Sequence, residues 1–128
     1  MEFTKAIVWE KSMLLAESVL LVCGLLPRQE RLGLRDQMSR AATSIPSNIA
    51  EGWVRESFKE KVHFLAIAHG SLAELHTQLL ICRRAGLLEA ADVSNSLALA
   101  DEVGRMLTAL KHRWRQARTI AKPPPAAP

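Results

Sequence analysis

The sequence contains no tyrosine, three phenylalanines and only two cysteines among its 128 residues. Phe58 and Phe64 fall within apolar helical rows, so no platform of aromatic rings for stacking single-stranded bases is evident. Cys23 and Cys82 also lie within apolar helical patterns and form no CxxC pair. These spacings predict buried free thiols, as expected of a cytoplasmic protein.

Long hydrophobic runs are missing as well. The most apolar stretch, residues 13–27, is interrupted by Glu17 and Ser18 and stopped by Pro27. It is shorter than the roughly 20 residues that a helix needs to span a bilayer. The N-terminus shows no apolar core followed by a small-residue cleavage site. We therefore expect neither a membrane span nor a signal peptide, and no membrane partner.

Motifs for catalysis and for cofactor binding are absent too. The chain has no GxGxxG, no P-loop, no GxSxG and no cysteine–histidine dyad, so we expect no catalytic residues, no cofactor and no enzymatic activity. His69 and His76 are seven residues apart, which places their rings about 10 Å apart along a helix. They are poorly spaced for one metal ion, and we expect His63, His69, His76 and His112 to lie in helix seams or interfaces.

Glycine and proline divide the chain into four helical blocks, and no strand-like alternation competes with them. Ser57, with Glu60 three residues on, predicts the start of the third helix, and Gly86 predicts its end. The expected helices cover residues 7–26, 30–53, 58–84 and 90–118. Short connections favour an all-α, antiparallel up-down four-helix bundle over residues 1–118, followed by a flexible Pro-rich tail over residues 119–128.

The stretch SIPSNIAEGW places Pro46 inside the second expected helix. Proline lacks an amide hydrogen and crowds the carbonyl of Ala42, so a helix through it should kink. Asn48 and Glu51 have the spacing of a capping box for a helix restart. However, apolar residues keep one face across the break, namely Met38, Ala42, Ile45 and Ile49. We therefore expect one long kinked helix.

In three of the expected helices, apolar residues cover more of the circumference than a single stripe. A helix in a monomeric bundle needs a single stripe somewhat over 100° wide. Further exposed apolar surface usually marks an interface. We expect a homo-oligomer, and the modest net charge of +4 per chain would grow to about +20 in a ring of five copies.

Three segments, VWEKSMLL, RLGLRDQMSRAATSIPSNIAEGW and SFKEKVHFLAIAHGSLAELHTQLL, resemble the bacterial 23S rRNA intervening-sequence protein family. A relative of that family is the accessory variability determinant of diversity-generating retroelements. The resemblance implies a four-helix bundle that assembles as a homopentameric ring without enzymatic activity. Its retroelement relatives resemble basic barrels that bind nucleic acid and a reverse transcriptase. Arg40 matches the family motif and is kept among the basic candidates below. The other matching motif residues, for which we expect structural or interface roles, are Gln37, Ser44, Pro46, Asn48, Glu51, Gly52, Gly70, Ser71, Glu74 and Leu75.

The chain departs from the family pattern at a few positions. His69 stands where the family commonly has arginine, and His76 where it commonly has an acid. The change at His69 weakens an RNA-binding inference drawn through that position.

Basic residues supply the candidate nucleic-acid surface. Lys111, Arg115, Arg118 and Lys122 recur on one helical stripe, and no acid lies among residues 111–122. Phosphate contacts through such a stripe would be salt-dependent and independent of sequence. Charge–dipole stabilisation of the helix C-terminus is an alternative explanation for part of it. The further candidates are Arg28, Arg31, Arg35, Arg40, Arg55, Lys59, Lys61 and Arg113.

Two functions remain open from the sequence. The first is a non-enzymatic oligomer that binds structured RNA or another nucleic acid through these basic surfaces. The second is a protein–protein adaptor or assembly module, in which the basic residues serve solubility and helix capping.

Overall fold

A computed structural model describes residues 1–27 and 33–121 of the chain. Those residues contain no strand and form a short 3₁₀ helix, η1, followed by four α-helices. The helices are η1 (Phe3–Lys5), α1 (Ile7–Cys23), α2 (Leu34–Val54), α3 (Phe58–Arg84) and α4 (Ala90–Ala121). The prediction of an all-α, four-helix chain is confirmed.

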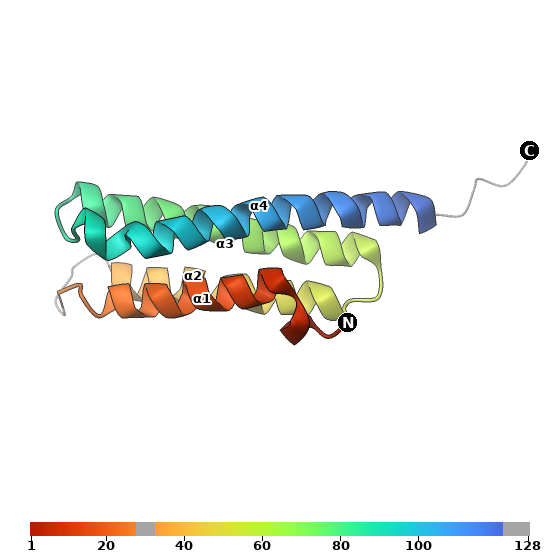
Figure 1. Cartoon of the computed structure of the whole chain (residues 1–128), viewed down its shortest axis with the longest axis horizontal. Coiled ribbons are helices and arrows are strands. Elements are labelled where there is room, and N and C mark those ends of the chain that lie inside the picture. The colour runs from red at the N-terminus through yellow and green to blue at the C-terminus, as the bar shows by residue number, and fades with distance from the viewer. Residues whose placement is uncertain (28–32, 122–128) are drawn as a thin grey trace, which may run out of the picture.

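The four long helices lie side by side along one axis (Figure 1). Each helix packs against two others, with contacts between α1 and α2, α2 and α3, α3 and α4, and α1 and α4. The end of the molecule where α1 starts also holds the end of α2, the start of α3 and the last part of α4 (Figure 1). At that end α4 runs past the start of α3, so its last turns project from the bundle.

Both predicted boundaries of α3 are confirmed. The Ser57 hydroxyl accepts a hydrogen bond from the Glu60 amide at 3.1 Å, which satisfies one of the free N–H groups at the helix start. At the other end Gly86 has a φ of 78°, a left-handed conformation that glycine adopts without steric cost and that stops the helix.

The other predicted boundaries differ from the structure by a few residues. Helix α1 ends at Cys23 rather than Leu26, because the next residues form tighter turns, with the Leu26 amide donating to the Cys23 carbonyl. The predicted start of the second helix at Glu30 lies outside the described residues. Helix α2 begins only at Leu34, after Gly33 with a φ of 65°. Helix α4 continues to Ala121, three residues beyond the predicted end at Arg118.

Helix α2 is continuous through Pro46, whose side chain is buried. The Asn48 amide nitrogen donates to the Ser44 carbonyl at 2.8 Å and to the Ser44 hydroxyl at 2.9 Å. Asn48 therefore supports the turn around the proline from within the helix, and the alternative of a capped restart at Asn48 is wrong. The single long helix is confirmed, while its kink stays a prediction.

Aliphatic side chains from all four helices fill the core. Leu15, Ile45, Leu75 and Leu107 are fully buried, one from each helix. Burying a side chain of this size contributes about 1.5–3 kcal/mol. Both cysteines are buried and free, as predicted. The core leaves other large apolar residues outside, and among the described residues α1 carries more of them than any other helix.

Candidate nucleic-acid interface

The structure divides the basic candidates between the two ends of the bundle. Arg35 and Arg40 lie in the first two turns of α2, near the end of α1. Arg28, Arg31 and Lys122 lie outside the described residues. The seven others lie in the segment after α2 and on the last third of α4, at the opposite end from Arg35 and Arg40 (Figure 1). These seven are Arg55, Lys59, Lys61, Lys111, Arg113, Arg115 and Arg118.

Two tryptophans hold α4 against the end of α2. The rings of Trp53 and Trp114 are 5.2 Å apart between centroids, and the Lys61 ammonium lies 5.3 Å from the Trp114 ring centroid. The same ammonium donates to the Trp53 carbonyl at 2.7 Å, so it satisfies a carbonyl at the C-terminus of α2. Burial lowers the pKa of Lys61. Lys61 therefore serves mainly to join α2, α3 and α4 rather than to offer a free charge.

Arg55 is similarly engaged at the end of α2. It pairs with Glu51 one turn earlier, and its guanidinium lies 4.8 Å from the centroid of the Phe64 ring. Because the Arg55 guanidinium contacts both a carboxylate and an aromatic ring, less of its positive charge is available to a ligand in solvent. Arg55 fixes the turn from α2 into α3 more than it extends a phosphate surface.

Lys111 is held by His69 across the α3–α4 seam. The Lys111 ammonium lies 2.7 Å from His69 Nδ1. An ammonium can only donate, so Nδ1 accepts, and the neutral His69 ring carries its proton on Nε2. Burial, followed by the charge of Lys111, lowers the pKa of His69. Burial, followed by the charge of Arg115, lowers the pKa of Lys111. The arrangement keeps His69 neutral and Lys111 partly withdrawn from solvent.

Four of the predicted basic residues remain exposed at this end: Lys59, Arg113, Arg115 and Arg118. No ion pair within residues 1–27 and 33–121 involves any of them. The prediction that the stripe on α4 faces solvent is confirmed for Arg115 and Arg118, and it holds only in part for the half-buried Lys111. The geometry thus concentrates accessible positive charge on the projecting turns of α4.

The motif residues of α2 and α3 meet in the seam between those helices. The Ser44 and Ser71 hydroxyls are 2.8 Å apart, and Asn48 donates to Ser44. A Cβ added at Gly52 would lie 3.0 Å from the Lys61 carbonyl oxygen, so glycine permits the close approach of α2 to α3. These contacts give the motif a packing role.

The remaining motif residues differ from one another in burial and in contacts. Leu75 is buried in the core, and Glu74 accepts a hydrogen bond from Gln78 at 3.2 Å. Gly70 is exposed and a Cβ there would meet nothing within 4 Å, while Gln37 is exposed at the start of α2. The motif as a whole therefore does not form one pocket.

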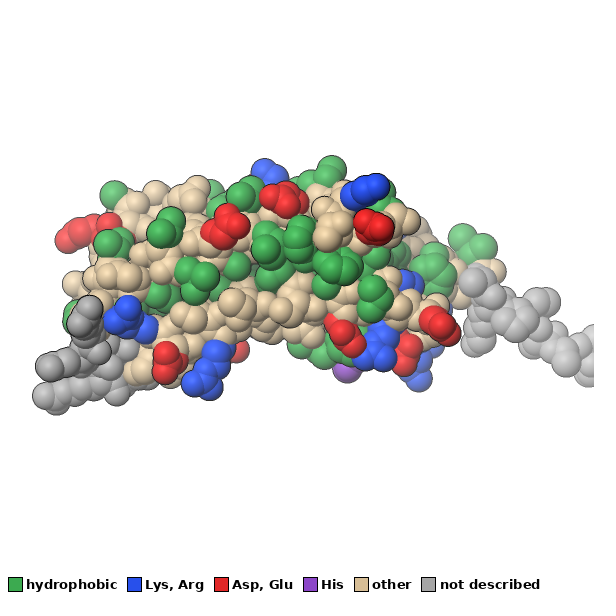
Figure 2. All heavy atoms as spheres, turned by 90° about the horizontal axis from the view of Figure 1, so that it is seen from below, with side chains coloured by type: hydrophobic (Ala, Val, Ile, Leu, Met, Phe, Trp, Pro, Cys, Tyr) green, Lys and Arg blue, Asp and Glu red, His purple; other side chains and the backbone are tan. Residues whose placement is uncertain are grey.

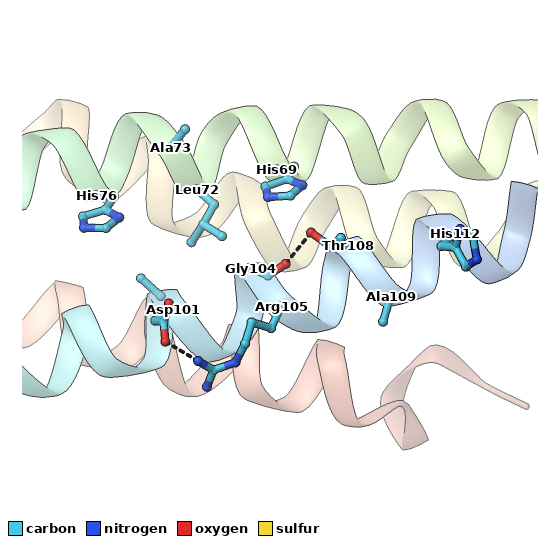
Figure 3. Close-up of a pocket in the computed structure, with 11 residues that line it drawn as sticks. His69, Leu72, Ala73, His76, Asp101, Gly104, Arg105, Thr108, Ala109 and His112 are labelled. Atoms are coloured by element: carbon cyan, nitrogen blue, oxygen red, sulfur yellow. Dashed lines mark hydrogen bonds and ion pairs between the residues drawn. The ribbon is translucent and has the colours of Figure 1, made fainter.

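A groove of about 700 Å³ runs between α3 and α4 (Figure 3). His69 and His76 lie on the side of α3 that faces α4, with Arg105 and His112 on α4. The buried residues at the bottom of the groove are Leu72 and Ala100, with Gly104 beside Leu72, while Ala73 and Ala109 line its exposed edges. Arg105 is paired with Asp101. Of the four histidines, His69 lies in a seam as predicted. His63, His76 and His112 are exposed, so for them an interface position stays a prediction.

Sequence reasoning missed the structural use of Trp114, Lys61 and Lys111. No role was predicted for Trp114 from the sequence, and the two lysines were grouped with the basic surface. For Trp114 and Lys61 the sequence does offer a signal. One tryptophan lies at the end of α2 and another near the end of α4, and their contact partly buries Lys61.

Residues 4–109 match the family model described as the 23S rRNA-intervening sequence protein. The chain belongs to this family. A solved structure of similar fold is that of a protein of unknown function from the S23 ribosomal protein family of Bacteroides thetaiotaomicron VPI-5482. It is 22% identical, with a TM-score of 0.77 over 82% of this chain and 98% of that one. At this identity the likeness concerns the fold alone. No curated protein matches the chain.

Two absences hold for the described part of this intervening-sequence family protein. None of its helices has the length and apolar character needed to cross a membrane. Across residues 1–27 and 33–121, no three histidine, cysteine or acidic side chains gather as metal ligands would.

Proposed function

We propose that the protein is a non-enzymatic, cytoplasmic, antiparallel up-down four-helix bundle that assembles as a homopentameric ring and binds structured RNA or another nucleic acid. The observation that carries the proposal is the group of exposed arginines near the end of α4, with Arg115 and Arg118 on the predicted stripe and Arg113 on another side of the helix. The family's name, which refers to a 23S rRNA intervening sequence, is consistent with an RNA partner.

The basic end of α4 suits phosphate contacts. The three arginines occupy less than two helical turns, and the chain has no acid among residues 111–122. The projection of α4 leaves this segment accessible from several sides (Figure 1). Arginine binds phosphate oxygens through a planar fork of donors, and such contacts position a protein on a nucleic acid without reading its sequence. The expected partner is therefore recognised by backbone shape and charge.

Self-association multiplies this surface. Five copies at +4 each would carry about +20, and a closed ring would present five such arginine clusters to one polyanion. Exposed aliphatic side chains support association: Ile7 is 69% exposed and Leu21 is 77% exposed. A soluble monomer rarely leaves such side chains grouped on one helix.

A protein–protein adaptor is the second candidate. The observation that favours it is the same apolar surface on α1, which suits a protein partner and not a polyanion. In that case Arg113, Arg115 and Arg118 would stabilise the C-terminus of α4, each by about 0.3–1 kcal/mol.

Titration of hairpin RNA across a salt series separates the two functions. The wild-type protein should lose affinity steeply between about 50 and 200 mM salt, because bound cations are released from the RNA. The variant R113A/R115A/R118A should show weaker binding at low salt, and the slope of log K against log salt should fall by about one for each phosphate contact removed.

The control is R83A/R84A, which removes two positive charges from exposed positions at the opposite end of the bundle and is compared with R115A/R118A. It should keep most of the wild-type slope. Equal losses in both variants would show that net charge alone matters. Absence of binding by the wild-type protein at low salt would contradict the nucleic-acid function and favour the adaptor.

A further inference from the structure

The outer side of α1 carries a row of exposed aliphatic residues. Ile7, Leu14 and Leu21 follow one another at intervals of seven residues along α1, Leu25 lies in the turn just after it, and the four are 69%, 39%, 77% and 58% exposed. Residues at this spacing lie on one side of a helix. We call these four residues the α1 ridge.

The α1 ridge lies beside the seam between α1 and α4. Lys11 forms an ion pair with Glu102 of α4 at 3.2 Å, and the Ser18 hydroxyl lies 2.7 Å from the Ser96 hydroxyl of α4. Lys11 lies between Ile7 and Leu14 along α1, and Ser18 lies between Leu14 and Leu21. The ridge therefore runs parallel to the α1–α4 seam, on its solvent side. The ridge therefore faces away from the core of its own subunit.

Two acids accompany the ridge. Glu10 and Glu17 are exposed, and no ion pair within the described part of the chain involves either carboxylate. They are seven residues apart, which is about 10 Å along the helix. In the view from below, apolar side chains gather along the middle of the face, and both acidic and basic side chains lie along its upper edge (Figure 2). The ridge is thus an apolar strip with negative charge on one side.

The groove between α3 and α4 has the complementary properties. Its bottom is apolar and is kept low by Gly104, where a Cβ would lie 3.3 Å from the Leu72 side chain. Its α3 side carries His69 and His76, which are also seven residues apart (Figure 3). Because His69 Nδ1 accepts from Lys111, its Nε2–H is left to donate. The groove therefore offers two donors at the same spacing as the two carboxylates on α1.

We propose that the α1 ridge of one copy docks in the α3–α4 groove of a second copy, with Glu10 and Glu17 against His69 and His76. Leucines of the ridge fill the apolar bottom of the groove, and the matched two-turn spacing sets the register. The proposal rests on the self-association in the proposed function and names the surfaces that produce it.

The two surfaces are different, so the contact is head-to-tail. Each copy then uses its ridge toward one neighbour and its groove toward another, and such a contact generates a closed ring or an open filament. The ridge lies beside the seam between α1 and α4, and the groove lies between α3 and α4. The two surfaces are therefore on neighbouring sides of the bundle. Successive copies then turn in the same direction, which favours closure into a small ring.

Charge exchange tests this docking. Sedimentation equilibrium at one protein concentration would compare the wild-type protein with E10K/E17K, with H69E/H76E and with the variant carrying all four substitutions. H69E/H76E places carboxylates opposite Glu10 and Glu17, and E10K/E17K replaces the two hydrogen-bond acceptors with ammonium groups, which can only donate. Each double variant should therefore shift the mass from a multiple of 14.2 kDa toward 14.2 kDa. The combined variant places opposite charges against one another and should regain the larger mass. Circular dichroism of each variant reports whether the helices remain folded.

The outcomes separate this inference from the proposed function. A wild-type mass of 14.2 kDa would overturn self-association and with it the docking. A wild-type oligomer whose mass is unchanged in both double variants would overturn the docking alone. Loss of mass in both double variants without recovery in the combined variant would also overturn the pairing, since an unspecific loss of stability would produce that pattern.

Discussion

The outer side of α1 and the projecting end of α4 expose opposite chemistry. The exposed side chains of α1 include large aliphatic ones, with Leu21 at 77%. Those at the end of α4 include several cations, with Arg115 and Arg118 exposed and no acid in residues 111–122. Apolar surface gains free energy when another apolar surface covers it, whereas clustered arginines gain from a polyanion. The difference indicates two separate partners, a further copy of the chain for α1 and a nucleic acid for α4.

The largest effect is expected from a substitution that removes the apolar character of the α1 ridge. Leu21→Asp places a carboxylate in the centre of the α1 ridge, where burial against a second copy would cost several kcal/mol. We expect light scattering after size exclusion to report a mass near 14.2 kDa for this variant. Salt-dependent RNA affinity should fall with it, because the arginine clusters no longer act together.

Leu20→Asp is the matched control for this variant. Leu20 is 48% exposed but lies on the other side of α1, in a depression it shares with Arg35 and Ser39 of α2. It should keep the wild-type mass. Equal dissociation of both variants would contradict the assignment of the interface to the ridge.

Local signals in the sequence predicted much of the fold. Ser57 with Glu60, and Gly86, fixed both ends of α3, because caps act within a few residues of the helix end. The predicted start of the second helix at Glu30 lies outside the described residues, and the sequence pattern did not show that Gly33 takes a left-handed conformation just before Leu34. The continuity of α2 through Pro46 followed from an apolar face preserved on both sides of the proline.

The candidate site was predicted less well. Exposure of Arg115 and Arg118 followed from helical spacing. The contacts of Lys61 with Trp53 and of Lys111 with His69 join residues on different helices, 8 and 42 positions apart. A lysine that satisfies a helix terminus and one that binds phosphate look alike in a sequence, so only the packing of the helices distinguishes them.

A smaller effect is expected from a substitution in the packing of α2 against α3, the two helices at whose junction the end of α4 is held. Gly52→Ala would bring a Cβ to 3.0 Å from the Lys61 carbonyl oxygen and 3.1 Å from the Phe64 Cβ. We expect this to push α2 from α3 and to lower the free energy of unfolding by about 1–3 kcal/mol. Urea unfolding at a fixed protein concentration measures the change.

Gly70→Ala is the control for Gly52→Ala, since a Cβ there meets nothing within 4 Å. Alanine is the better helix former, so this variant should raise the free energy of unfolding by up to about 1 kcal/mol. Similar values for the two glycines would contradict the close approach of α2 and α3 at Gly52.

The smallest expected effect concerns pH and the seam between α3 and α4. Burial and Lys111 lower the pKa of His69 in the folded protein, so below pH 6.5 the unfolded chain binds more protons than the folded one. Stability should therefore fall as the pH drops from 6.5 through the lowered pKa. His69→Gln should remove part of this fall in urea midpoints measured at pH 7.5 and 5, while His63→Gln, on the exposed side of α3, should retain it. An unchanged fall in the first variant would contradict the role of His69.

The mass of the wild-type protein at micromolar concentration, from sedimentation equilibrium, tests the central claim most directly. If aliphatic side chains on α1 are covered by further copies, the mass should be about five times 14.2 kDa and stay constant on moderate dilution. A single species of 14.2 kDa would show that the exposed leucines of α1 face water, and the case for a multiplied positive surface would end with it.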